Sequence, residues 1–284
     1  MDNPGSLTRP RELRAYLDAL GFHPSKSMGQ NFLIDPHVRD AILDAAGVGP
    51  GDRVVEVGPG LGVMTEGLLE RGASVLAIEL DGRLVEHLRR WFGENPNLTL
   101  REGDATETDW AAALSPDPVH VVSNLPYSVG SRVLFDLAEP GHMPAGITVM
   151  VQSDVADRLC AAAGDEDYGL LTVRMAFPFA IRRVRNVPGT CFLPPPRVGS
   201  TVVHLARRPP EERPLADPAF FAELIKFAFS RRRKQLGTIL RQFPGLAGLS
   251  PDGLPLDLSR RPETLSPTEW AQTSDALSER VRNR

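Results

Sequence analysis

The chain has 284 residues, of which 42% are hydrophobic and 24% are charged, a composition typical of soluble globular proteins. At roughly 100 to 200 residues per domain, this length favours two domains, or one domain with a sizeable appendage. No run approaches the roughly 18 apolar residues of a membrane span, and the N-terminus lacks the apolar core of a secretory signal, so we expect a cytoplasmic protein without a membrane partner. Cys160 and Cys191 have no metal-ligand partners at close spacing, so we expect neither a disulfide framework nor a metal site.

Charge is distributed unevenly along the chain. The 32 Lys and Arg and 36 Asp and Glu give a formal net charge of -4, which by itself argues against a nucleic-acid partner. Two stretches without acidic residues carry clustered basic ones: Arg182, Arg183, Arg185, Arg197, Arg207 and Arg208 in the first, and Lys226, Arg231, Arg232, Arg233, Lys234 and Arg241 in the second. Because local potential steers a polyanion, both stretches are candidate nucleic-acid contacts.

The predicted elements begin with two helices and then alternate between strand and helix. Leu13, Leu17 and Leu20 recur at helical spacing within residues 11–20, and a second helix is expected over 37–48. Strands are expected over 53–58 and 74–80, with helices over 64–72 and 83–92. Three further β-branched segments, 98–105, 118–127 and 146–152, each indicate a strand that ends in polar or turn residues. This order predicts an α/β fold with a doubly wound, Rossmann-like sheet, in which ligand residues stand at the carboxyl ends of strands.

A proline-rich, charged stretch over residues 207–218 is expected to be a linker, because the sequence after it differs in kind. Residues 220–243 are predicted to form a helix, and a shorter helix is predicted over 267–277. We therefore expect a catalytic domain over residues 1–207 and a small helical domain over residues 208–284.

A glycine-rich turn follows the first predicted strand of the alternating region. Gly58, Gly60 and Gly62 lie where that strand should pass into a helix, and glycine lets the backbone approach a ligand closely. The spacing differs from the Gly-x-Gly-x-x-Gly of dinucleotide sites. Glu79, at the end of the next strand, can accept hydrogen bonds from a ribose, and Asp104, at the end of the third, can accept from an adenine amino group. The set predicts S-adenosylmethionine as cofactor, with NAD as the alternative.

The segment from Asn124 to Tyr127 follows the fourth strand. The N6 nitrogen of adenine is a poor nucleophile because its lone pair is delocalised into the ring. The side-chain oxygen of Asn124 and the main-chain carbonyl of Leu125 could accept its two protons, while Pro126 restricts the turn and Tyr127 stacks on the base. Catalysis would then consist mostly of positioning. In isolation, the same four residues would be a proline-bearing β-turn.

Four segments together resemble one family. They are Gly29-Gln30-Asn31-Phe32-Leu33, the Glu56 to Gly62 turn, Asn124 to Tyr127, and Phe192-Leu193-Pro194-Pro195-Pro196-Arg197-Val198. Over roughly residues 10–240 the chain is similar to the ribosomal RNA adenine N6,N6-dimethyltransferases, specifically to the branch that modifies two adjacent adenines near the 3′ end of 16S RNA in the small ribosomal subunit.

The resemblance implies roles that the residues alone would not. It implies cofactor contacts from Asn31 and Leu33, together with Gly58, Glu79, Asp104 and Asn124, and it makes Phe192 an aromatic wall of the substrate mouth. Without it, the segment around Asn31 would be a capping loop and the triple proline a rigid extended segment. With it, Arg231, Arg232, Arg233 and Lys234, expected on a helix, become a phosphate clamp instead of a solvated face.

The sequence departs from the family pattern at Ser128, Leu170, Gly199 and Gly237. Leu170 and Gly237 each remove an expected phosphate contact, which leaves open whether the RNA target is the same. Three rival functions remain: an antibiotic-resistance type methyltransferase of large-subunit RNA, a DNA adenine methyltransferase, and a ribosome-assembly factor with little catalysis. We expect a monomer.

Overall fold

The computed structural model describes residues 9–19, 21–22, 24, 30–139, 141–212, 215–246 and 248–283, so that Leu20 and Gly29 lie outside the described residues. It divides into two compact units. Unit 1 comprises Met1–Leu137, His142–Ala156 and Arg182–Ala206, and unit 2 comprises Ala138–Gly141, Asp157–Ile181 and Arg207–Arg284.

The second unit is larger than the helical domain expected over residues 208–284. It takes in residues 157–181, which were expected in the catalytic domain. The reason is apolar burial: Tyr168 is fully buried in the unit 2 core, and its hydroxyl donates to the carbonyl of Leu265 at 2.6 Å. The composition of the sequence changes at the predicted linker, but residues 157–181, which precede it, also pack in the core of unit 2.

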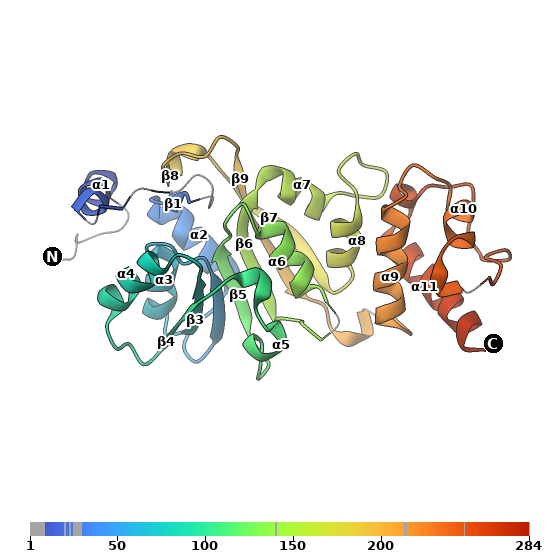
Figure 1. The fold of residues 1–284 in the computed structure, drawn as a ribbon, viewed down its shortest axis with the longest axis horizontal. Helices are drawn as coiled ribbons and strands as arrows, with labels where there is room; N and C mark the ends of the chain where they lie inside the picture. Colours follow the sequence, from blue (N-terminus) through green and yellow to red (C-terminus); the bar gives the residue numbers. More distant parts are fainter. Residues whose placement is uncertain are drawn as a thin grey trace. The chain divides into compact units, whose positions relative to one another are not determined.

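Unit 1 is built on a mixed sheet with the strand order β4-β3-β2-β5-β6-β9-β7 (Figure 1). The strands are β2 (Arg53–Val57), β3 (Ser74–Glu79), β4 (Leu98–Glu102), β5 (His120–Asn124), β6 (Gly146–Gln152), β7 (Phe179–Val187) and β9 (Ser200–Arg207). A separate pair joins β1 (Phe32–Leu33) to β8 (Phe192–Leu193). The five strands expected from β-branched runs are present as β2 to β6, while the sequence does not predict β1, β7, β8 and β9.

The direction of the strands places a ligand site at one edge of this sheet. Strands β2 to β6 pair in parallel, and β9 runs antiparallel to β6. The chain moves outward from β2 through β3 to β4 and then returns to β5 on the other side of β2. Ligands of open α/β sheets bind outside the carboxyl ends of the strands at such a reversal, which here lies between β2 and β5.

Helices connect the strands, and their ends follow local sequence signals. Asp35 accepts from the amides of His37 and Val38, which caps α2, and Gly47 ends that helix in the left-handed conformation at φ 65°. The helices are α1 (Pro10–Ala19), α2 (Pro36–Ala46), α3 (Val63–Glu70), α4 (Gly82–Phe92), α5 (Trp110–Ala113), α6 (Gly130–Leu137), α7 (Ser153–Cys160), α8 (Leu170–Ala176), α9 (Pro218–Phe229), α10 (Leu236–Arg241) and α11 (Pro267–Arg282). Short 3-10 turns are η1 (Ala105–Glu107), η2 (Gly189–Cys191), η3 (Pro210–Glu212), η4 (Pro244–Leu246) and η5 (Pro262–Thr264).

The core of unit 1 lies between α2 and the sheet. Ile42 and Leu43 of α2 are buried with Val54, Val122 and Met150 of the strands. Burial of apolar area at about 25 cal/mol per Å² stabilises this layer and so fixes the strand ends that form the site.

Unit 2 is helical, and α9 contacts α8, α10 and α11. Its core includes Leu224, Ile239 and Trp270, all fully buried. Ser266 and Glu269 form a capping box at the start of α11, where Pro267 occupies the first turn. In the part of the chain that the structure describes, no helix is long and apolar enough to cross a membrane.

The single helix predicted over residues 220–243 is wrong. Helix α9 ends at Phe229, a turn follows, and α10 begins at Leu236. The first amides of α10 bond to a distant loop, with Leu236 N donating to Arg260 O at 2.8 Å and Gly237 N to Leu258 O at 2.9 Å. These two amides therefore do not donate to carbonyls of the preceding turn, as they would in one continuous helix. The basic residues Arg231, Arg232, Arg233 and Lys234 lie on the turn between the two helices.

Candidate active site

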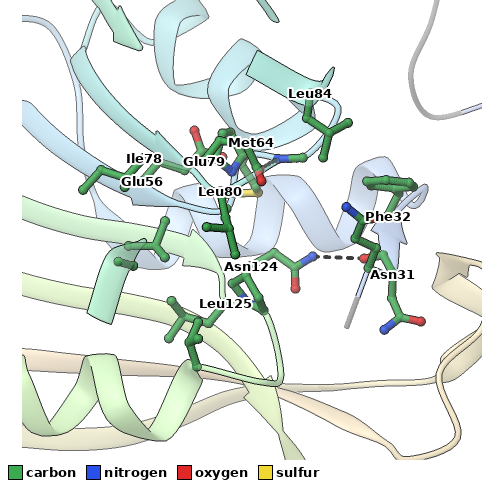
Figure 2. A pocket seen from close by; sticks show the side chains of 18 of the residues that line it. Asn31, Phe32, Glu56, Met64, Ile78, Glu79, Leu80, Leu84, Asn124 and Leu125 are labelled. Atoms are coloured by element: carbon green, nitrogen blue, oxygen red, sulfur yellow. Dashed lines mark hydrogen bonds between the residues drawn. The ribbon is translucent and has the colours of Figure 1, made fainter. Parts of the chain in front are cut away.

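An open cavity of about 210 Å³ lies at the carboxyl ends of β2, β3 and β5, where the strand order predicts a ligand. Most of the residues predicted to form the site line it: Asn31, Leu33, Gly58, Gly60, Glu79, Asp104, Asn124, Leu125, Pro126 and Tyr127. Figure 2 shows several of them converging from the Asn31 segment, the strand ends and the Asn124 turn. The departure Ser128 also lines this cavity.

The glycine turn needs glycine for two reasons. Gly58, Gly60 and Gly62 have φ of 65°, 59° and 93°, a region that side chains rarely adopt. A Cβ on Gly58 would lie 2.6 Å from Cγ of Pro126, and one on Gly62 would lie 2.8 Å from the ring of Phe92. The turn therefore packs closely against Pro126 and Phe92 on one side. Gly58 and Gly60 also line the cavity, where a ligand could approach the backbone.

Glu79 is tied to the backbone around the cavity. Its side chain accepts from Gly60 N at 3.1 Å and from Asp81 N at 3.0 Å. Burial raises the pKa of Glu79 above its ordinary value, since only 7% of the residue is exposed. The carboxyl group thus links the end of β3 to the glycine turn and lies at the cavity wall.

Asp104 has a different environment. One carboxylate oxygen, Oδ1, accepts from the amide and from the hydroxyl of Thr106, each at 2.7 Å. These hydrogen bonds lower the pKa of Asp104, beginning with the bond from the Thr106 amide, so its side chain is an acceptor at neutral pH. The bonds orient the carboxylate at the edge of the cavity, where the sequence predicts an adenine contact.

The side-chain amide of Asn124 is oriented by the Asn31 segment. Nδ2 of Asn124 donates to the main-chain carbonyl of Asn31 at 3.5 Å, as the dashed line in Figure 2 marks. The carbonyl of Pro126 accepts from Val129 and Gly130 and closes the following turn. Among the backbone bonds between described residues outside helices and strands, none goes to the carbonyl of Leu125. Asn124 and Leu125, the two residues predicted to supply acceptors, both line the cavity.

Tyr127 is half-buried and lines the cavity. Its hydroxyl is hydrogen-bonded to Oγ of Ser200 on β9, with 2.6 Å between the oxygens. Burial raises the pKa of Tyr127, so the ring remains neutral at neutral pH. An anchored, neutral ring at this position presents a face on which a flat base can stack.

The cavity is also lined by an acid for which the sequence predicts no role. Glu56, on β2, is 1% exposed and accepts from the hydroxyl of Thr65 at 2.6 Å. Burial raises its pKa to about 8, so this carboxyl group is largely protonated at pH 7. The signal available in the sequence was an acidic residue inside an otherwise apolar strand, directly before the glycine turn.

Phe192 does not lie where it was predicted. It is 3% exposed and belongs to the apolar core of unit 1, and its strand residue pairs with Leu33. Burial in the core stabilises this apolar ring, and Phe192 is not among the residues that line the cavity. The pairing of β8 with β1 instead helps to hold the Asn31 segment.

The four basic residues of unit 2 divide into two pairs. The guanidinium group of Arg231 lies 3.7 Å from the centre of the Phe227 ring, and Arg232 donates to the carbonyl of Glu166 at 2.8 Å. Arg233 and Lys234 are exposed, and no ion pair joins them to any other described residue. Arg231 and Arg232 thus contact other groups of unit 2, whereas Arg233 and Lys234 project into solvent without an ion pair to a described residue.

The remaining departures are explained by packing in two cases. A Cβ on Gly199 would lie 3.0 Å from Oγ of Ser153, and one on Gly237 would lie 3.3 Å from Cβ of Leu258. Leu170 begins α8 and packs against the unit 2 core. The described residues contain no cluster of three or more His, Cys, Asp or Glu side chains that could hold a metal ion.

The strand order and the cavity at its reversal define a Rossmann-like class I S-adenosylmethionine-dependent methyltransferase. A family model described as ribosomal RNA adenine dimethylase matches residues 21–248, and the chain belongs to this family. The family membership predicted from the four motifs is thereby confirmed.

Similar proteins agree with this assignment. The chain is 37% identical over 91% of its length to a ribosomal RNA small subunit methyltransferase A of Syntrophotalea carbinolica, 98% of which is covered. It is 36% identical over 96% of its length to the protein of the same name from Bacillus licheniformis, again with 98% of that protein covered.

Two solved structures have related folds. A dimethyladenosine transferase from Plasmodium falciparum superposes with a TM-score of 0.71 and 26% identity, covering 85% of this chain and 95% of that one. The 23S rRNA methyltransferase ErmE superposes with a TM-score of 0.64 and 25% identity, covering 87% of this chain and 100% of that one.

Proposed function

We propose that the protein transfers methyl groups from S-adenosylmethionine to the N6 atoms of two adjacent adenines near the 3′ end of 16S ribosomal RNA, within the small ribosomal subunit of the cytoplasm, and forms N6,N6-dimethyladenosine. The relatives named small subunit methyltransferase A support this substrate, since they match nearly the whole chain. Modification of this RNA would give the protein a role in small-subunit biogenesis.

The observation that carries the proposal is the orientation of Asn124. Because Nδ2 donates to the carbonyl of Asn31, Oδ1 is left to accept a proton of the adenine amino group. The carbonyl of Leu125 accepts the second proton, so that the nitrogen becomes more pyramidal and its lone pair less delocalised. Tyr127 stacks on the base and holds this nitrogen in line with the reacting carbon.

The residues around the cavity fit the cofactor. When bound, S-adenosylmethionine supplies an electrophilic methyl group on its sulfonium sulfur. Glu79 binds the ribose hydroxyls, Asp104 accepts from the adenine amino group, and Leu80, 53% exposed at the cavity, offers an apolar surface to the adenine ring. The target nitrogen loses its proton to water or a nearby acceptor after each transfer, so that no strong base is required.

The substrate must reach the cavity as an unstacked base. Extrusion from a helical stack costs a few kcal/mol, which favours a loop or a partly assembled subunit over a closed duplex. We propose that unit 2, including the expected helical domain over residues 208–284, docks on the RNA, and that Arg233 and Lys234 supply its phosphate contacts. The protein acts as a monomer, which sedimentation of the purified chain tests.

The experiment uses labelled S-adenosylmethionine and offers unmodified small subunits, large subunits and duplex DNA separately. We expect label on the small subunit only. Asn124→Ala should abolish transfer and leave the fold intact, whereas Asn97→Ala, at an exposed position, should be fully active. Tight binding to small subunits without label would favour an assembly factor.

The 23S rRNA methyltransferase neighbour supports methylation of large-subunit RNA as a second candidate. The two functions share the fold and the chemistry of Asn124 to Tyr127, and they differ in the RNA. Label found only on the large subunit would replace our proposal with this one.

A further inference from the structure

A buried histidine links the N-terminal helix to the glycine turn. His87 lies on α4 and is 5% exposed. Its Nε2 lies 3.1 Å from the carbonyl oxygen of Leu61, and its Nδ1 lies 2.7 Å from the hydroxyl of Tyr16 on α1. One hydrogen-bonded relay thus joins His87 to Leu61, 26 positions earlier in the chain, and to Tyr16, 71 positions earlier.

The chemistry of the partners fixes the direction of both bonds. A carbonyl oxygen can only accept, so Nε2 of His87 carries the proton and donates to Leu61. In the neutral ring Nδ1 then accepts, and the hydroxyl of Tyr16 donates to it. Burial lowers the pKa of His87 and raises the pKa of Tyr16, which keeps both groups in the neutral forms that the relay needs.

The peptide held by this relay belongs to the proposed cofactor site. Leu61 lies between Gly60 and Gly62, and its residue lines the cavity described above. It also lines a second cavity of about 210 Å³ that Tyr16 and His87 share. Glycines on both sides leave this peptide few conformational restraints of its own, so an external hydrogen bond has a large influence on its orientation.

Apolar contacts bring α1 to the same place. Leu13 and Leu17 of α1 are buried in a cluster with Phe32, Leu61 and Leu84. The ring of Tyr16 packs edge-on against His87, with 5.4 Å between ring centres, and against Trp91 at 6.0 Å. Apolar contacts alone would not fix the orientation of α1 on these residues. The hydrogen bond between Tyr16 and His87 adds a directional contact to this interface.

We propose that His87 is a positioning residue for cofactor binding, which acts by fastening the main-chain carbonyl of Leu61 to the docked N-terminal helix. This inference rests on the proposed use of S-adenosylmethionine at the cavity. The inference implies that α1 affects the affinity for the cofactor, although α1 belongs neither to the glycine turn nor to the strand ends. His87 itself is absent from the residues that line the cofactor cavity.

The test measures the dissociation constant of S-adenosylmethionine with the full chain by calorimetry. His87→Leu removes both bonds, His87→Gln retains an N–H near the position of Nε2, and Tyr16→Phe removes only the hydroxyl. We expect about tenfold weaker binding for the leucine variant, a change of about 1.4 kcal/mol, and at most about threefold for the other two. The turnover number at saturating cofactor and RNA should stay within about twofold of the wild-type value.

His37→Leu, at an exposed histidine, is the matched control and should bind as the wild type does. Thermal unfolding of each variant separates positioning from a general loss of stability. Equal affinities for all variants, or equal losses for His87→Leu and His87→Gln, would overturn the inference. If the leucine variant fails to fold, a tenfold loss of affinity in a folded His87→Gln variant would overturn it. Wild-type protein that binds the cofactor but labels no RNA would refute the proposed function and leave this test intact.

Discussion

The side-chain amide of Asn124 is held by the main-chain carbonyl of Asn31, with 3.5 Å between nitrogen and oxygen. The two residues are 93 positions apart, and the contact joins the last residue of β5 to the residue before β1. This bond fixes the orientation of the amide, because Nδ2 of Asn124 faces the carbonyl of Asn31 and Oδ1 therefore faces away from it. Asn124→Asp should therefore fail in catalysis, since a carboxylate offers Asn31 no donor and is repelled by its carbonyl.

For Asn124→Asp we expect a fall in kcat of at least about 100-fold, comparable to the loss of an oriented donor at other active sites. Single-turnover label transfer measures the chemical step directly. Calorimetric binding of S-adenosylmethionine accompanies it, to separate lost binding from lost chemistry. A kcat within tenfold of the wild-type value would show that the amide orientation does not matter.

Gly58→Ala should destabilise the protein and impair the cofactor cavity. The substitution places a side chain at φ 65° and a Cβ 2.6 Å from Pro126. We expect a loss of unfolding free energy above about 2 kcal/mol, measured by urea denaturation.

Gly51→Ala is the matched control for this position. Gly51 has φ 86°, but a Cβ there would meet nothing within 4 Å, so the cost should be about 1 kcal/mol, from the backbone alone. Equal losses for the two variants would mean that the contact with Pro126 is relieved without cost.

Glu56→Gln should change how stability depends on pH. The folded protein keeps the proton of Glu56 up to about pH 8, whereas the unfolded chain releases it near its ordinary pKa of 4.5. Between these values the folded state binds one more proton, so the free energy of unfolding falls by about 1.4 kcal/mol for each pH unit of increase, relative to the glutamine variant.

Denaturant unfolding of both proteins at pH 5, 6 and 7 checks this slope. The variant should be the more stable protein at pH 7, and the difference should shrink as the pH falls. Glu94→Gln, at an exposed acid, should show no such divergence from the wild type. Parallel pH profiles for wild type and Glu56→Gln would contradict a protonated Glu56.

The two pairs in the basic turn should respond differently to alanine. Replacing Arg233 and Lys234 should weaken binding to the small subunit and reduce the slope of log affinity against log salt by about 2, because each side chain would neutralise one phosphate. The thermal midpoint should not change, since neither side chain forms an ion pair with a described residue.

Arg231→Ala should show the opposite pattern. Its guanidinium stacks on Phe227, so its removal should lower the thermal midpoint and leave the salt slope nearly unchanged. A salt slope altered equally by both sets of substitutions would show that Arg231 also reaches the RNA.

The sequence predicted the strand ends because parallel strands bring their carboxyl ends to one edge of the sheet. Glu79, Asp104 and Asn124 follow β-branched runs, and the structure places all three around one cavity. Strand β7 escaped prediction because its exposed residues do not alternate regularly with buried ones. Its place in the sheet depends on pairing with β9, which local sequence does not reveal.

Other errors have the same tertiary origin. The break after Phe229 was invisible, because the bonds that start α10 come from residues 258–260. The family resemblance implies a place for Phe192 at the substrate mouth, but an aromatic ring suits both a wall and a core, and only the fold decides between them. Glu56 received no role because its raised pKa arises from burial, a property of the folded state.

Mapping of the methylated nucleosides tests the central claim most directly. Small subunits lacking the modification are incubated with the protein and S-adenosylmethionine, and fragments of the 16S RNA are analysed by mass spectrometry. We expect two methyl groups on N6 of each of two adjacent adenines near the 3′ end, and none when Asn124→Ala is used. Methylation of any other atom or position, or equal methylation by the Asn124→Ala variant, would contradict the account.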